Sequence, residues 1–355
     1  MLLIYTNNLT NRLKFVFNQI CNRILSIPIS FTTRVETFIS HEGPKISYAP
    51  QPLGNEFFIK SHGLLFDQGI SDVEINVQKW KETKCFFYSG ENSNLPFDIF
   101  SAAFYLLSRY EEYLPHVKDN YGRFTKNDSI AFKYNFLTQP VVDIWALYFK
   151  EALKQHFPKH HFPCSKFSIE PVIDVPMAYY FKSKGLFRTL GGIFSDLINF
   201  RFQLFYDRFF VLSKLKKDPY DNFEWIINCQ KKSKQRFTIF FLVGDYTKFD
   251  KNISITKKSF ITLIKSMRDY CEVGLKCSYK ALADLIILKK EKQELDGVLN
   301  TTTEKVRSSF SKVNLPSTYR NYVELEIKKD YSMGYPDEIG FRAGTSFPFL
   351  FYDID

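Results

Sequence analysis

The chain has 355 residues, of which 45% are hydrophobic and 24% are charged, and its net charge is +10. These values exclude a disordered chain and a collagen-like repeat, and the length allows one large domain or two ordinary ones. Phenylalanine and tyrosine are abundant, with 38 and 21 residues, whereas all 6 histidines precede residue 162. Imidazole-based chemistry in the later part of the chain would therefore need histidines from the earlier part.

The excess of basic residues permits binding to nucleic acid, anionic glycans or an anionic membrane surface. The basic residues are dispersed, and the densest charged stretch, residues 288–294, mixes both signs. This pattern is typical of a solvated surface, so we expect no nucleic-acid partner.

The six cysteines form no Cys-x-x-Cys pair, which favours free thiols in a reducing compartment. The first residues lack the regions of a signal peptide, and no uncharged apolar run reaches the roughly 18 residues of a membrane span. We therefore expect a cytoplasmic protein without a transmembrane segment.

In the first half, the pattern predicts a strand at residues 2–5 and helices at 11–24, 97–113 and 141–157. Residues 43–63 are rich in glycine and proline and are typical of loops with short strands. A polar stretch with prolines and histidines follows the last helix. We therefore expect an N-terminal α+β domain of unknown function over residues 1–163.

The second half, residues 164–355, alternates predicted strands and helices. Strands are expected at 167–175, 237–243, 272–276, near Tyr331 and at 339–342, and helices at 186–215, 222–232, 257–267, 281–295 and 303–310. This alternation is typical of a parallel α/β sheet or a barrel. Functional residues of such folds gather at the carboxyl ends of the strands.

The residues expected at these ends include Asp174, Asp245, Lys276 with Ser278, and Arg342. A buried aspartate is costly unless it is paired or used, and Asp174 with Arg342 would form a suitable ion pair. The pair could be a carboxylate base oriented by a guanidinium or a purely structural ion pair. Asp245 could equally cap a loop.

Residues 182–217 mix seven phenylalanines with basic side chains. This composition is compatible with a helix that binds a membrane surface or a protein partner. The alternative, which we favour, is a helix packed on the sheet, with arginine stems spread over apolar surface. Phosphate-binding loops, dinucleotide-binding glycine motifs and Gly-x-Ser-x-Gly elbows are not present in the sequence.

Five segments carry a family resemblance: residues 95–115, 121–124, 217–221, 330–335 and 340–345. Together they resemble Bacteroidetes proteins described as polysaccharide deacetylase-like, in which an N-terminal domain precedes a NodB-type barrel. The resemblance implies a deformed or incomplete (β/α) barrel after a smaller α+β domain. Since related proteins continue into further barrel elements, the barrel is expected to lack its last elements.

Deacetylases of this kind use an aspartate base, an arginine that orients it, and a metal held by a second aspartate and two histidines. The resemblance assigns Asp174 as the base and Arg342 as the orienting arginine. The metal-ligand positions hold Pro176, Lys276 and, within residues 307–310, serine. We therefore expect neither zinc nor another cofactor.

The resulting hypothesis is a deacetylase-like protein that binds carbohydrate and has lost the metal chemistry, with Asp245, Lys276, Ser278 and Tyr279 as substrate-binding residues. An active hydrolase that uses Asp174 without a metal, or with one held by Asp174 and Asp245, is an alternative. A basic interaction protein that acts at a membrane or a glycan assembly site is another.

Overall fold

The computed structural model describes residues 1–163 and 167–355, which form two compact units. Unit 1 comprises Met1–Phe167, Asn314–Pro316 and Met333–Asp355, and unit 2 comprises Ser168–Val313 and Ser317–Ser332. The predicted boundary between residues 163 and 164 adjoins the three residues outside the described chain, one of which is Cys164. Residues 333–355 follow unit 2 in the chain but belong to unit 1.

Unit 1 contains a four-stranded parallel sheet in the order β2-β1-β3-β4. The strands are β1 (Leu2–Tyr5), β2 (Ile29–Thr32), β3 (Lys45–Ala49) and β4 (Phe57–Lys60), and a separate antiparallel ribbon pairs β5 (Gln78–Trp80) with β6 (Thr83–Cys85). The predicted strand at residues 2–5 is confirmed. The main sheet differs from that of an α+β domain because its strands are all parallel.

The α-helices of unit 1 are α1 (Asn11–Phe17), α2 (Val35–Ser40), α3 (Ile99–Leu107), α4 (Ile130–Lys133) and α5 (Val141–His156). A π-helix, Asn18–Ile24, continues α1, so the predicted helix at 11–24 is confirmed. The helix predicted at 97–113 is shorter. It begins after Asp98, which accepts hydrogen bonds from two backbone amides, and it ends before Arg109, whose φ of 56° is left-handed.

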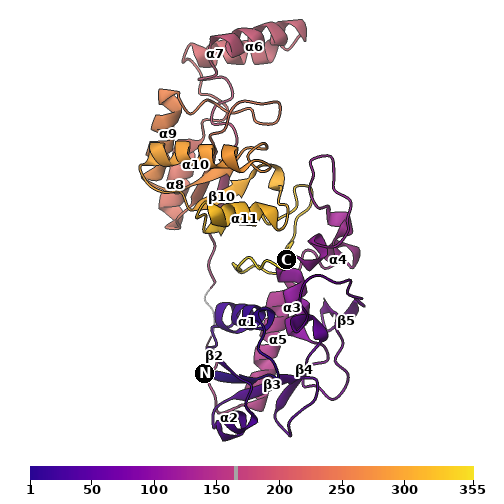
Figure 1. Cartoon of the computed structure of the whole chain (residues 1–355). Coiled ribbons are helices and arrows are strands. Elements are labelled where there is room, and N and C mark those ends of the chain that lie inside the picture. The colour runs from indigo at the N-terminus through magenta and orange to yellow at the C-terminus, as the bar shows by residue number, and fades with distance from the viewer. Residues whose placement is uncertain (164–166) are drawn as a thin grey trace. The chain divides into compact units, whose positions relative to one another are not determined.

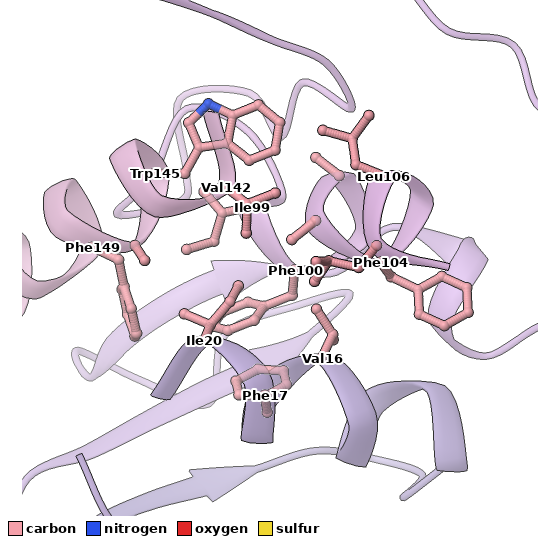
Figure 2. Close-up of a cluster of buried hydrophobic side chains, with 14 of the residues drawn as sticks. Val16, Phe17, Ile20, Ile99, Phe100, Phe104, Leu106, Val142, Trp145 and Phe149 are labelled. Carbon is pink, nitrogen blue, oxygen red and sulfur yellow. The ribbon is translucent and has the colours of Figure 1, made fainter. Parts of the chain in front are cut away.

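The core of unit 1 explains much of the phenylalanine content. Figure 2 shows Phe17 of α1 and Phe100 of α3 beside Phe149 of α5. The rings of Phe17 and Phe100 are stacked with centroids 3.6 Å apart, and the rings of Phe100 and Phe149 meet edge to face. All three side chains are fully buried, so aromatic packing holds these helices together.

Unit 2 contains a five-stranded parallel sheet in the order β11-β10-β9-β8-β7. Its strands are β7 (Val172–Val175), β8 (Thr238–Leu242), β9 (Glu272–Cys277), β10 (Lys305–Ser308) and β11 (Lys329–Asp330). Its α-helices, which are labelled in Figure 1, are α6 (Leu186–Ile198), α7 (Phe202–Leu212), α8 (Phe223–Ser233), α9 (Lys258–Arg268), α10 (Leu285–Leu299) and α11 (Ser317–Glu324). The predicted alternation of strands and helices is confirmed.

Three predicted elements are wrong. The helix expected at 303–310 is instead strand β10, and residues 339–342 form no strand. The long helix expected at 186–215 is divided into α6 and α7, because Phe200 between them has a left-handed φ of 54°.

The two faces of the unit 2 sheet differ in polarity because successive side chains of a strand point to opposite faces. Ile239 and Phe241 of β8 and Val273 and Leu275 of β9 share one hydrophobic core with side chains of α8, α9, α10 and α11. The helices of this core therefore cover the same face of the sheet. The opposite face carries the charged side chains of Asp174, Lys276, Lys305 and Arg307 beside the buried Phe240 and Leu242. In the described chain the sheet is open rather than a closed barrel.

The described cysteines are all free thiols, and all except Cys229 are buried. Burial raises the pKa of Cys85 to about 11, so this thiol stays protonated at neutral pH. In the described residues, no helix combines the length and the apolar character that crossing a bilayer requires. A cytoplasmic location stays a prediction.

Candidate functional site

The carboxyl edge of the unit 2 sheet brings together three charged side chains from three strands. Lys276 Nζ of β9 and Arg307 Nε of β10 each lie 3.0 Å from Asp174 Oδ2 of β7. Lys276 and Arg307 stand opposite each other in the β9–β10 pair, so both side chains emerge on the polar face. Two candidate residues, Asp174 and Lys276, are thus in direct contact, together with an arginine that the sequence analysis did not select.

The burial of this ion cluster is uneven. The Lys276 side chain is 8% exposed, whereas those of Asp174 and Arg307 are each 32% exposed. A buried ammonium group needs a counter-ion, and Asp174 supplies it. Arg307 also donates a hydrogen bond from Nη1 to the backbone oxygen of Tyr331, 2.5 Å away, which fixes the direction of the guanidinium.

A second polar cluster lies on the same face, around Glu170. Its Oε1 accepts hydrogen bonds from Thr238 at 2.6 Å, Tyr331 at 2.7 Å and Lys305 at 3.2 Å. Burial acts to raise the pKa of Glu170, but the hydrogen bonds from Thr238, Tyr331 and Lys305 outweigh it and lower the pKa. This face therefore carries paired charges beside the buried Phe240, whose ring lies 5.1 Å from that of Tyr331.

Three aromatic rings follow the carboxyl ends of β8, β9 and β10. The ring of Phe249 lies 4.3 Å from that of Tyr279 and 6.1 Å from that of Phe310, and the last two are 5.7 Å apart between centroids. All three are half-buried, and we call them the aromatic trio. Phe310 and Ser311 both have left-handed φ angles, 60° and 52°, and such conformations cluster at functional sites.

Buried carboxylates hold the loop that carries Tyr279. Asp250 Oδ2 accepts the backbone amide of Tyr279 at 3.1 Å, and Glu291 Oε2 accepts that of Ser278 at 3.0 Å. The Ser278 hydroxyl accepts a hydrogen bond from the amide of Ala281. Ser278, a candidate substrate-binding residue, is buried and shapes this loop, whereas Tyr279 is half-buried in the trio and Lys312 Nζ lies 4.4 Å from the centre of its ring.

Asp245 is not part of the ion cluster. Its side chain is 87% exposed and pairs with Lys290 Nζ at 3.1 Å. The carboxylates of Asp174 and Asp245 thus have separate cationic partners.

Arg342, the other predicted catalytic residue, lies in unit 1 with its guanidinium bound by Glu112. The pair is bidentate, with 2.9 Å between Nε and Oε1 and 2.7 Å between Nη2 and Oε2, and both side chains are at least 98% buried. The arginine in contact with Asp174 is Arg307. A catalytic role for Asp174 or Arg342 stays a prediction.

Arg109 completes this buried network. Its Nε donates to Glu112 Oε1 at 2.8 Å and its Nη2 donates to Glu111 Oε1 at 2.6 Å, while Nη1 donates to the backbone oxygen of Arg342. Burial acts to raise the pKa of Glu112, but Arg342 and Arg109 outweigh it and lower the pKa. Signature residues from 95–115 and 340–345 therefore meet in one structural network that holds the C-terminal segment in unit 1.

A divalent metal does not fit the ion cluster. The oxygen that would bind it, Asp174 Oδ2, is already in contact with two cationic groups, which would repel a metal ion. Pro176 and Lys276 offer neither a carboxylate nor an imidazole. Among the described residues, no three histidine, cysteine, aspartate or glutamate side chains gather as metal ligands.

The comparisons with known proteins concern the first part of the chain. Residues 2–158 match a family model described as a family of unknown function, DUF7033. No curated protein and no solved structure matches the chain. The DUF7033 match includes Arg109 and Glu112 but neither Arg342 nor the ion cluster of unit 2.

The sequence analysis missed Arg307 and two rings of the trio. Arg307 alternates with Val306 and Ser308 along β10, and Phe310 follows directly. Such an alternation over four residues is a signal for a strand, and Arg307 would then have stood beside Lys276. Phe249 carries no comparable signal, since it lies in a loop.

Proposed function

We propose that unit 2 is a carbohydrate-binding domain on a deacetylase-like scaffold that does not use the metal chemistry of deacetylases. The architecture supports this proposal in two ways. The strands β7 to β11 are neighbours in chain order, and the helices of the core cover one face. Both properties are typical of a (β/α) barrel, of which this open sheet would be an incomplete form.

The observation that carries the proposal is the set of groups at the carboxyl edge. Asp174 is paired with Lys276 and Arg307 where a deacetylase would need a metal site, and the aromatic trio follows the neighbouring strand ends. Charged side chains can hydrogen-bond sugar hydroxyls, and half-exposed rings can stack against the apolar faces of sugar rings. The two cations would also favour sugars that bear a carboxylate.

Titration calorimetry of the full chain with oligosaccharides tests this proposal. The probes are N-acetylglucosamine oligomers and uronic acid oligomers, and the variants are Phe310→Ala and Arg307→Gln. We expect binding to at least one probe, a loss of about tenfold or more in Phe310→Ala, and no acetate release. The matched controls are Phe187→Ala, an exposed phenylalanine of α6, and Arg236→Gln, an exposed arginine outside the site.

If none of the probes binds at millimolar concentration, the proposal is wrong. Stoichiometric zinc together with acetate release that Asp174→Asn abolishes would overturn its metal-free part. Binding that neither site variant weakens would place the sugar site elsewhere.

A hydrolase with a metal held by Asp174 and Asp245 is less well supported. Asp245 pairs with Lys290 at an exposed position, and Asp174 pairs with Lys276 and Arg307. The same acetate and metal measurements would detect such an enzyme.

A further inference from the structure

Helices α6 and α7 form a helical hairpin within unit 2, joined by residues 199–201 (Figure 1). The base of the hairpin is fixed by Asp218, which is 2% exposed. Its carboxylate accepts the backbone amides of Tyr180, Phe181 and Lys182, at 2.8 to 3.0 Å, and that of Tyr220 at 3.1 Å. One buried side chain thus holds the segments that enter and leave the hairpin.

The hairpin exposes an unusual amount of apolar surface. Of the thirty-two large hydrophobic side chains exposed in the described chain, thirteen lie between Leu186 and Leu215. Phe187 is 94% exposed, Phe200 is 78% exposed and Phe194 is 66% exposed. Scattered exposed hydrophobic residues need no explanation, but a continuous group of this size marks an interaction surface.

The exposed side chains form a stripe on each helix. On α6 they include Phe187, Leu190 and Phe194, and on α7 they include Phe202, Tyr206 and Phe209. The spacing of three or four residues places each set on one face of its helix.

The contact between the two helices is polar. Arg208 Nη2 of α7 lies 2.8 Å from Asp196 Oδ2 of α6, and these side chains are only 10% and 7% exposed. The absence of a side chain at Gly192 makes room for them, because a Cβ there would lie 2.5 Å from the Arg208 guanidinium. The hairpin therefore has paired charges inside and phenylalanine outside, the reverse of an element built to face water.

The charge of the hairpin indicates its partner. Residues 182–217 contain eight basic and two acidic residues, and Asp196 is already used inside the hairpin. Two such surfaces would repel each other, so a second copy of the chain is a poor occupant. Basic residues beside exposed aromatic and aliphatic side chains complement anionic headgroups above an apolar interior.

We propose that the α6–α7 hairpin binds the surface of an anionic phospholipid bilayer. The phenylalanines of the stripes enter the boundary between headgroups and acyl chains. Lys184 before α6 and Lys214 after α7 contact lipid phosphates from the base of the hairpin, whereas Lys182, Lys216 and Lys217 pair with Asp221, Asp207 and Glu224. The bilayer supplies the apolar surroundings that these side chains lack in water.

Vesicle co-sedimentation of the full chain tests the proposal. The vesicles contain phosphatidylcholine alone or equal parts of phosphatidylcholine and phosphatidylglycerol. We expect binding to the mixed vesicles at least about tenfold tighter than to the neutral ones. Raising the salt from about 0.15 M to about 1 M, which shortens the screening length from about 8 Å to about 3 Å, should weaken it.

Two variants separate the hairpin from other exposed residues. The triple variant Phe187→Ser, Phe194→Ser, Phe209→Ser should bind the mixed vesicles at least about tenfold more weakly. The control Ile39→Ser, Ile286→Ser, Val323→Ser removes equally exposed apolar side chains elsewhere and should bind normally. Circular dichroism verifies that both remain folded.

Several results would overturn the proposal. They are no binding to mixed vesicles, equal binding to both vesicle types, and unchanged binding of the hairpin variant. Sedimentation equilibrium supplies a further test. A dimer that the hairpin substitutions dissociate would assign the surface to a second copy of the chain instead.

Discussion

Arg342 and Glu112 lie 230 positions apart in the chain and form a bidentate ion pair in the interior of unit 1. Arg109 binds the same carboxylate and that of Glu111, so two glutamates neutralise two buried guanidinium groups. This geometry gives the resembling segments 95–115 and 340–345 a structural role that does not depend on catalysis.

Replacing Glu112 tests that role. In Glu112→Gln, two buried guanidinium groups lose their shared counter-ion, and unit 1 should be destabilised by about 3 kcal/mol or more. Urea unfolding followed by the fluorescence of Trp145, which is 1% exposed, reports on this unit when Trp225 of unit 2 is changed to Phe. The control Glu151→Gln removes an exposed partner of Lys154 and should cost less than about 0.5 kcal/mol. Equal effects of the two substitutions would contradict the structural role.

The ion cluster of unit 2 should show unequal couplings. In double-mutant cycles with Asp174→Asn, the coupling to Lys276→Gln should reach about 2 kcal/mol and that to Arg307→Gln should stay below about 1 kcal/mol. The reason is that the Lys276 side chain is 8% exposed and that of Arg307 is 32% exposed. The exposed pair Asp245 and Lys290 is the control and should show almost no coupling. A larger coupling for Arg307 than for Lys276 would refute this ranking.

Glu291 should make the stability of unit 2 depend on pH. Burial raises its pKa to about 7 from an ordinary 4.5, and its Oε1 has no hydrogen-bond partner among the described residues. The unfolded chain loses the proton first as the pH rises, so the free energy of unfolding should fall between pH 4.5 and about 7. The full loss is on the order of 3 kcal/mol.

The variant Glu291→Gln removes this titration. Thermal unfolding from pH 4 to pH 9 should show that wild type loses stability relative to the variant as the pH rises, with no further change above the folded pKa. A difference between the two proteins that is constant with pH would show that Glu291 is ionised in the fold.

Two glycines of unit 2 should respond oppositely to alanine. A Cβ on Gly274 would lie 2.4 Å from the Phe240 ring and 3.0 Å from the backbone oxygen of Lys305, so Gly274→Ala should destabilise by about 1–3 kcal/mol. A Cβ on Gly297, inside α10, would meet nothing within 4 Å. Gly297→Ala should therefore stabilise by about 0.5–1 kcal/mol. Denaturant midpoints of the two variants measure both effects, and midpoints shifted in the same direction would not agree with this packing.

The local sequence pattern predicted those elements in which burial against the rest of the fold produces a regular spacing of apolar residues. The apolar run at 237–243 is a strand buried on both faces, and β8 lies within it. The run at 303–310 failed because Lys305 and Arg307 point into polar clusters, so β10 shows no apolar alternation on that face. The alternation of Val306 with Lys305 and Arg307 covers only four residues, which was too short to distinguish a strand from a helix.

Only part of the site could be predicted, because the order of the elements places some residues and not others. Asp174 and Lys276 could be placed at strand ends from the order of the elements, and they are in contact. The partner of Arg342 could not be predicted, because residues 333–355 return to unit 1 and Glu112 lies far away in the sequence. Without knowledge of that return, an arginine near the carboxyl end of a predicted strand is indistinguishable from one near the active site.

The return of residues 333–355 to unit 1 also sets the order in which the molecule can be completed during synthesis. All of unit 2 is translated before Arg342, so during that time the nascent chain carries Arg109 and Glu112 without their third partner. A segment that is translated after unit 2 thus completes unit 1, most of which is translated before unit 2. A ribosome that has just added Ser332 therefore carries the complete sequence of unit 2, while unit 1 still lacks residues 333–355.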